Sequence, residues 1–100
     1  MPDPLRIADR ELHSRLILGS GGFANHEVLA EACREAEVEV CTVALRRLPD
    51  PAHPQGSILD VLAASGVEVL PNTAGCFTAR DAVTTAQLAR EAFQTDWIKL

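Results

Sequence analysis

A lysine near the end of the chain has the type and setting that best predict chemistry. Lys99 lies in residues 96–100, DWIKL, among large apolar neighbours. This stretch is typical of a buried strand, in which alternation places Trp97 and Lys99 on the same face. Burial lowers the pKa of a lysine because desolvation disfavours the charged form, and the neutral amine attacks a ketone or aldehyde. The pattern therefore predicts Schiff-base chemistry at Lys99. The alternative is a lysine whose stem lies on apolar surface while its ammonium group reaches water.

A glycine cluster is the second candidate site. Residues 19–24, GSGGFA, follow a predicted strand and precede a predicted helix, and they match the loose dinucleotide fingerprint G-x-G-x-x-A. Arg46 and Arg47 end the next predicted strand, where an NADP-type site places a cation. Arg46 is therefore a candidate for binding phosphate or carboxylate. The alternatives are a tight turn and a solvated or subunit-facing arginine pair.

Polar residues after the third predicted strand form the third candidate. Asn72 and Thr73, in the stretch PNTAGC, could hydrogen-bond a polar substrate, although Asn, Thr and Gly are also ordinary turn residues. Cys76 follows them without a histidine nearby in sequence, which favours an inert thiol. The cysteines and histidines show no spacing typical of a disulfide framework or a metal site.

Composition limits the classes of protein that fit. One hundred residues suffice for one domain at most. The net charge of −5 argues against a nucleic-acid partner, because phosphate-binding proteins normally carry a basic face. No apolar run approaches the ~18 residues of a membrane helix, and the N-terminus lacks a signal-peptide pattern. We therefore expect a cytoplasmic protein that contacts neither nucleic acid nor membrane.

The elements that must position these residues alternate between strand and helix. Strands are predicted near residues 17, 41, 69 and 98, and a short hairpin from residues 5–7 and 11–13 precedes them. Asn25, Ser57 and Thr78 are N-cap residues of the three helices between the strands, and Gly66 suits the end of the second helix. Such alternation predicts an α/β fold with parallel strands. A doubly wound sheet and the first half of a (β/α)₈ barrel both fit, and Leu100, which ends the chain inside a predicted strand, favours a fragment.

Four stretches together resemble one family: SRLILGSGGF, CTVALRR, LPNTAGCFTAR and TDWIKL. They are similar to the N-terminal portion of bacterial thiazole synthase, an enzyme of the thiamine pathway. The resemblance covers nearly the whole chain and implies that residues 1–100 form a partial (β/α)₈ barrel, with roughly the first four strands and three helices. It also implies that Lys99 is the catalytic lysine on the fourth strand, which forms an imine with the substrate ketone.

The same resemblance implies substrates and partners. The family condenses 1-deoxy-D-xylulose 5-phosphate with a glycine-derived imine made by another enzyme. A small sulfur-carrier protein with a C-terminal thiocarboxylate supplies the sulfur, and the synthase assembles with itself. No cofactor or metal is expected. The family's glutamate two positions after the lysine, a later aspartate and the phosphate-binding loops are not in this sequence, so residues 1–100 alone are expected to be inactive.

Two other functions also fit the sequence as alternatives to a Schiff-base enzyme. One is an NADP-type nucleotide-binding module that uses Gly19, Gly21 and Arg46. The other is a non-catalytic α/β domain in which Lys99 is an exposed chain end.

Overall fold

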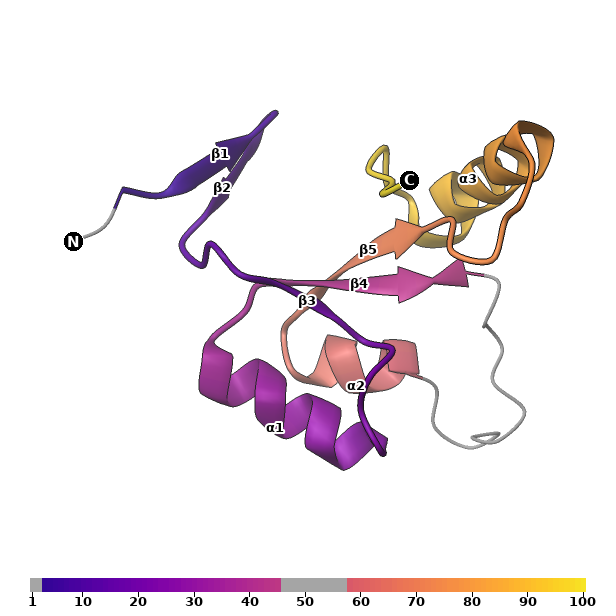
Figure 1. The fold of residues 1–100 in the computed structure, drawn as a ribbon. Helices are drawn as coiled ribbons and strands as arrows, with labels where there is room; N and C mark the ends of the chain where they lie inside the picture. Colours follow the sequence, from indigo (N-terminus) through magenta and orange to yellow (C-terminus); the bar gives the residue numbers. More distant parts are fainter. Residues whose placement is uncertain (1–2, 46–57) are drawn as a thin grey trace.

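The computed structural model describes residues 3–45 and 58–100. The first half holds β1 (Leu5–Ile7), β2 (Arg10–Leu12), β3 (Ile17–Gly19), α1 (His26–Ala36) and β4 (Val40–Ala44). The second half holds α2 (Ile58–Ala64), β5 (Glu68–Asn72) and α3 (Ala79–Phe93). Helices α1 and α2 lie side by side below the sheet, whereas the β1–β2 hairpin and the C-terminal segment lie on its other side (Figure 1). None of the helices in the described part is long and apolar enough to cross a membrane.

The central sheet is parallel, as the alternation of strands and helices predicts. Its strand order is β3-β4-β5, so each strand pairs with the next one along the chain. One row of paired residues, which faces α1 and α2, consists of Leu18, Cys41 and Val69. The next row toward the strand ends points to the opposite face and consists of Gly19, Thr42 and Leu70. The fold class is therefore α/β with a parallel sheet, which is compatible with part of a barrel.

The hydrophobic core lies between the sheet and the helices α1 and α2. Leu29 and Cys33 of α1 and Leu62 of α2 are almost fully buried, and they pack with Cys41 and Val43 of β4. The strand β4 is buried on both faces, as its continuous apolar sequence predicts. In α2 Leu62 is fully buried, while Ile58, Leu59 and Val61 are half-buried.

Side chains that begin the helices match the sequence predictions where they are described. The Asn25 side chain accepts a hydrogen bond from the Val28 N–H at 2.9 Å, and the Thr78 hydroxyl accepts one from the Asp81 N–H at 3.0 Å. Gly66 follows α2 with a φ of 70°, in the left-handed region that glycine adopts easily. The predicted cap Ser57 lies outside the described residues.

The N-cap of α1 gives a first prediction. Asn25→Ala leaves the Val28 N–H without its acceptor, so we expect the free energy of unfolding to fall by about 1 kcal/mol. Urea denaturation followed by circular dichroism measures the change. Asn25→Ser, which keeps an acceptor oxygen, is the matched control and should stay near wild type. An equal loss in both variants would show that the cap does not act through this hydrogen bond.

The N-terminal hairpin is present, with one shift from the prediction. β1 pairs antiparallel with β2, and Leu5 lies opposite Leu12. The second strand is Arg10–Leu12 rather than residues 11–13. The reason is that the N–H groups of His13 and Ser14 donate to the Glu39 carboxylate, at 2.5 and 2.8 Å, so the chain leaves the hairpin there and turns toward the sheet.

The predicted buried last strand is wrong in its extent and its burial. Among residues 97–100, Lys99 alone forms a parallel bridge, to Asn72 of β5. Lys99 is exposed, and the side chain of Leu100 is 90% exposed. This segment is exposed because it has a neighbour on one edge alone. In the described part of the chain, β5 lies on one side of it and no strand pairs with its other side. A strand buried on both faces needs neighbours on both edges.

Candidate active site

Lys99 lies in a row of paired residues at the carboxyl ends of the strands. Ala44 pairs with Asn72, and Asn72 pairs with Lys99. This row follows Thr42 and Leu70 by two residues along each strand, so it belongs to the face that points away from α1 and α2. Two backbone hydrogen bonds hold Lys99 there: its N–H donates to the Pro71 carbonyl at 2.9 Å, and its carbonyl accepts from the Thr73 N–H at 3.1 Å.

A cavity of about 630 Å³ opens on this face, and Lys99 is part of its lining. Most of its walls are apolar, and they include Gly19 at the end of β3 and Thr42 in the middle of β4. The other lining residues are Ile7, Ile17, Leu70, Asp96, Trp97 and Ile98. A primary amine beside an apolar cavity suits imine formation with a carbonyl compound, because the apolar walls can hold the carbon chain of a substrate next to the amine.

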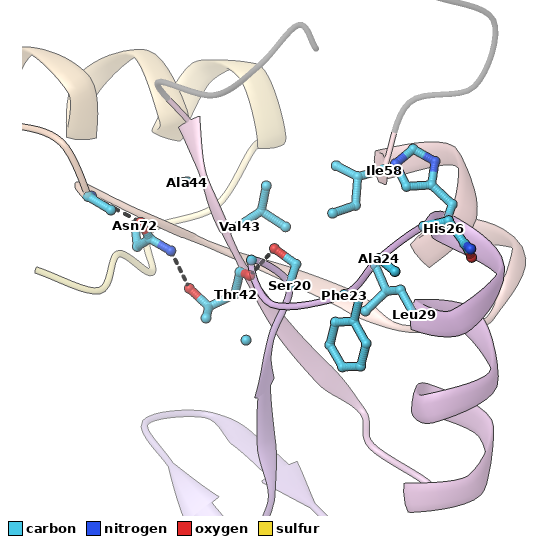
Figure 2. A pocket seen from close by; sticks show the side chains of 14 residues that line it. Ser20, Phe23, Ala24, His26, Leu29, Thr42, Val43, Ala44, Ile58 and Asn72 are labelled. Carbon is cyan, nitrogen blue, oxygen red and sulfur yellow. Dashed lines mark hydrogen bonds between the residues drawn. The ribbon is translucent and has the colours of Figure 1, made fainter. Parts of the chain in front are cut away.

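A second cavity, of about 370 Å³, lies at the glycine turn (Figure 2). Its lining includes the turn residues Gly19, Ser20 and Gly21, the start of α1, and the ends of β4 and β5. Gly19 and Thr42 line both cavities, so the two cavities adjoin at these residues. The glycine turn therefore lies beside the predicted lysine site and belongs to the same end of the sheet.

Hydrogen bonds fix the polar residues between the cavities. The Asn72 side-chain amide donates to the Thr42 hydroxyl at 2.8 Å, and its oxygen accepts from the Ala74 N–H at 3.0 Å (Figure 2). The Ser20 hydroxyl donates to the Thr42 carbonyl at 2.8 Å. These bonds join β3, β4 and β5 at their carboxyl ends and define the direction of the Asn72 side chain.

The structure brings together some of the predicted site residues. Asn72 is adjacent to Lys99 across the bridge, and Thr73 follows it with 8% of its surface exposed. Asn72 and Thr73 thus lie next to the lysine, and their binding of substrate stays a prediction. Arg46 lies outside the described residues. No group of three or more His, Cys, Asp or Glu side chains within residues 3–45 and 58–100 is arranged to hold a metal ion.

Sequence reasoning missed Arg10. Its guanidinium group forms an ion pair with the Glu68 carboxylate and lies over the ring of Trp97. No short-range pattern could have identified this residue, because Arg10 and Glu68 are 58 positions apart in the chain.

The buried cysteines are chemically protected. Burial, together with the charge and hydrogen bonding of the neighbouring Cys33, raises the pKa of the Cys41 thiol to about 12. Burial also raises the pKa of Cys33, partly offset by its hydrogen bond to Cys41. Cys76 is half-buried, with its sulfur 3.3 Å from the Thr85 hydroxyl.

These thiols give a second prediction. At pH 8 we expect iodoacetamide to alkylate Cys76 first, while Cys33 and Cys41 react only after unfolding, because the thiolate is the nucleophile. The ordinary thiol pKa is 9.0. The stability that comes from keeping the buried Cys41 thiol protonated is therefore complete below pH 9.0 and is lost as the pH rises toward about 12. Peptide mass spectrometry measures the order of labelling, and chain unfolded in urea is the control. Labelling of Cys41 as fast as Cys76 in the folded chain would contradict the prediction.

Comparison with known proteins agrees with the geometry. A family model described as thiazole biosynthesis protein ThiG matches residues 6–100. The chain belongs to this family. It is 48% identical to a thiazole synthase of Rhizobium etli over 96 residues, which is 96% of this chain and 37% of that relative. It is 46% identical to a thiazole synthase of Azorhizobium caulinodans over 100 residues, which is all of this chain and 37% of the relative. A thiazole synthase of Vibrio vulnificus is 45% identical over 96 residues, again 96% of this chain and 37% of the relative.

Membership of the ThiG family confirms the resemblance found in the sequence. The chain spans 37% of the length of these curated relatives. The family model and the thiazole synthase relatives do not favour the alternative of a nucleotide-binding module based on Gly19, Gly21 and Arg46. In this ThiG-family chain the glycine turn lies beside the cavity that Lys99 lines.

Proposed function

We propose that this chain supplies the first strands and helices of a (β/α)₈ thiazole synthase, with Lys99 as its imine-forming amine. The observation that carries the proposal is the place of Lys99. It lies beside the carboxyl ends of parallel strands, where barrel enzymes keep their active sites, and it lines an apolar cavity. Family membership supplies the reaction class.

The proposed reaction begins with imine formation. The Lys99 nitrogen attacks the ketone carbon of 1-deoxy-D-xylulose 5-phosphate, a C–N bond forms, and the ketone oxygen leaves as water. The protonated imine withdraws electrons from the neighbouring carbon, which then loses a proton to give an enamine. Sulfur from a thiocarboxylated carrier protein and a glycine-derived imine from a partner enzyme complete the ring. Self-assembly of the synthase and a cytoplasmic location stay predictions.

Other residues have supporting roles in this proposal. Asn72 and Thr73 border the amine and would contact the polar part of the sugar, and Arg46 stays a candidate for substrate binding. The hydrogen bonds of Asn72 to Thr42 and Ala74 support a fixed direction for its side chain. A rigid amide next to a nucleophilic amine suits the orientation of a hydroxylated substrate.

Reductive trapping tests the proposal. The protein is a chimera of the relatives' full length, in which residues 1–100 replace the aligned part of the Rhizobium etli thiazole synthase. It is incubated with 1-deoxy-D-xylulose 5-phosphate and sodium borohydride, which reduces an imine to a stable secondary amine. Lys99 is the only lysine of this chain, so mass spectrometry assigns an adduct within its residues without ambiguity, apart from the N-terminal amine. We expect the adduct at Lys99. An adduct confined to a lysine of the appended portion would contradict the proposal.

A further inference from the structure

We propose that Arg10 is a positioning residue for Lys99. It joins the N-terminal hairpin to β5 and to the segment that carries the lysine, and so fixes that segment on the edge of the sheet. The role of Lys99 in catalysis rests on the proposed function, whereas the positioning itself can be tested without it.

The contacts of Arg10 converge on two residues. Its guanidinium hydrogen-bonds both carboxylate oxygens of Glu68, with Nη1 2.6 Å from Oε2. The same group lies over the ring of Trp97, with its central carbon 5.2 Å from the ring centroid. Glu68 is the first residue of β5, and Trp97 precedes Lys99 by two positions. One side chain therefore connects the hairpin, the sheet and the lysine segment.

The lysine segment needs such a connection because its own pairing is short. The bridge to Asn72 provides two backbone hydrogen bonds, to Pro71 and from Thr73. Isolated edge pairing of this length opens readily, since few buried contacts oppose its opening. Trp97 and Lys99 are two residues apart, so holding the Trp97 ring also limits the movement of the segment that carries Lys99.

The guanidinium group is suited to both contacts at once. Its planar fork matches the two oxygens of a carboxylate, and its flat face stacks on an aromatic ring. A lysine ammonium can keep the charge but cannot provide the fork and the flat face together. The chemistry of the site therefore predicts a graded series, in which arginine holds the segment best, lysine holds it partly and glutamine does not.

Amide hydrogen exchange of the 100-residue chain tests the positioning. In Arg10→Gln we expect the Lys99 and Thr73 amides to exchange about 10-fold faster than in wild type. The Val67 amide, which donates to the Leu62 carbonyl at 2.9 Å in the core between α2 and β5, should not change. Arg6→Gln, at an exposed arginine of the same hairpin, is the matched control and should leave all three amides unchanged. Trp97 is the only tryptophan, so quenching of its fluorescence by acrylamide should increase in Arg10→Gln alone.

The outcomes separate positioning from general stability. If Arg10→Gln also accelerates the Val67 amide, the whole core has been weakened, and Arg10→Lys then decides. A faster Lys99 amide with an unchanged Val67 amide in that variant supports the proposal. Unchanged exchange at Lys99 in the deciding variant, or a rise there matched by Val67, overturns it.

Trapping in the full-length chimera connects positioning to chemistry. With 1-deoxy-D-xylulose 5-phosphate and borohydride, Arg10→Gln should form the Lys99 adduct about 10-fold more slowly at saturating substrate, with little change in the half-saturating concentration. Arg10→Lys should recover part of the rate. If wild type forms no adduct at Lys99, the proposed function fails, while the exchange result still decides on the positioning role. A normal trapping rate in Arg10→Gln overturns the link between Arg10 and the amine.

Discussion

Replacing Lys99 by alanine in the full-length chimera should abolish the borohydride adduct at this position and reduce thiazole formation at least about 10³-fold, because the amine is the covalent nucleophile of the proposed reaction. Lys99→Arg should be equally inactive, since a guanidinium group stays protonated and does not attack a ketone. Product formation with the sulfur donor and the glycine-derived imine measures turnover, and trapping measures the first step.

The Lys99 variants should keep their fold, which makes the result interpretable. Lys99 is exposed, and its sheet contacts are made by its backbone N–H and carbonyl groups. The circular dichroism spectrum should therefore match that of wild type. The free energy of unfolding, measured by urea denaturation, should agree with wild type within about 0.5 kcal/mol. Full trapping of Lys99→Ala at another lysine, with normal turnover, would eliminate Lys99 as the imine-forming residue.

A core substitution has the second large expected effect. Leu62→Ala should lower the free energy of unfolding by about 2–5 kcal/mol, because the side chain is fully buried and its removal leaves a cavity. The helix α2 has seven residues, and a helix this short is unstable without packing against its neighbours. Domains typically have a free energy of unfolding of about 5–15 kcal/mol. The variant should therefore lose a large fraction of it and unfold at a lower urea concentration.

An exposed leucine provides the control. Leu88 of α3 is 59% exposed, and Leu88→Ala should change stability by no more than about 0.5 kcal/mol. Urea denaturation followed by circular dichroism and by Trp97 fluorescence measures both variants. Equal midpoints for Leu62→Ala and Leu88→Ala would contradict the assignment of the core to the space between the sheet and the helices α1 and α2.

Local sequence signals predicted most of the framework. The Asn25 and Thr78 caps are confirmed because a cap depends on one side chain and a backbone N–H three residues away. The three parallel strands are confirmed because their apolar runs alternate with amphipathic helices. The bridge between Asn72 and Lys99 pairs the end of the third parallel strand with the last segment, and it appears in the structure.

Signals that depend on neighbours were less informative. The composition of the last segment predicts a buried strand. The structure has a single bridge there, and Lys99 is exposed, because the burial of a strand depends on the strands that pair with its two edges. The ion pair of Arg10 with Glu68 could not be predicted from a local pattern, because the two residues are 58 positions apart. Arg46, a candidate for binding phosphate or carboxylate, lies outside the described residues, and its role stays a prediction.

The sequence by itself determined the order of the three parallel strands and their helices, the Asn25 and Thr78 caps and the family, because these depend on residue types and short spacings. Tertiary structure alone decided that the glycine turn and the lysine share one end of the sheet, and that Arg10 reaches both Glu68 and Trp97. The physical reason is that strand register and the position of the hairpin bring together side chains that the chain itself keeps far apart.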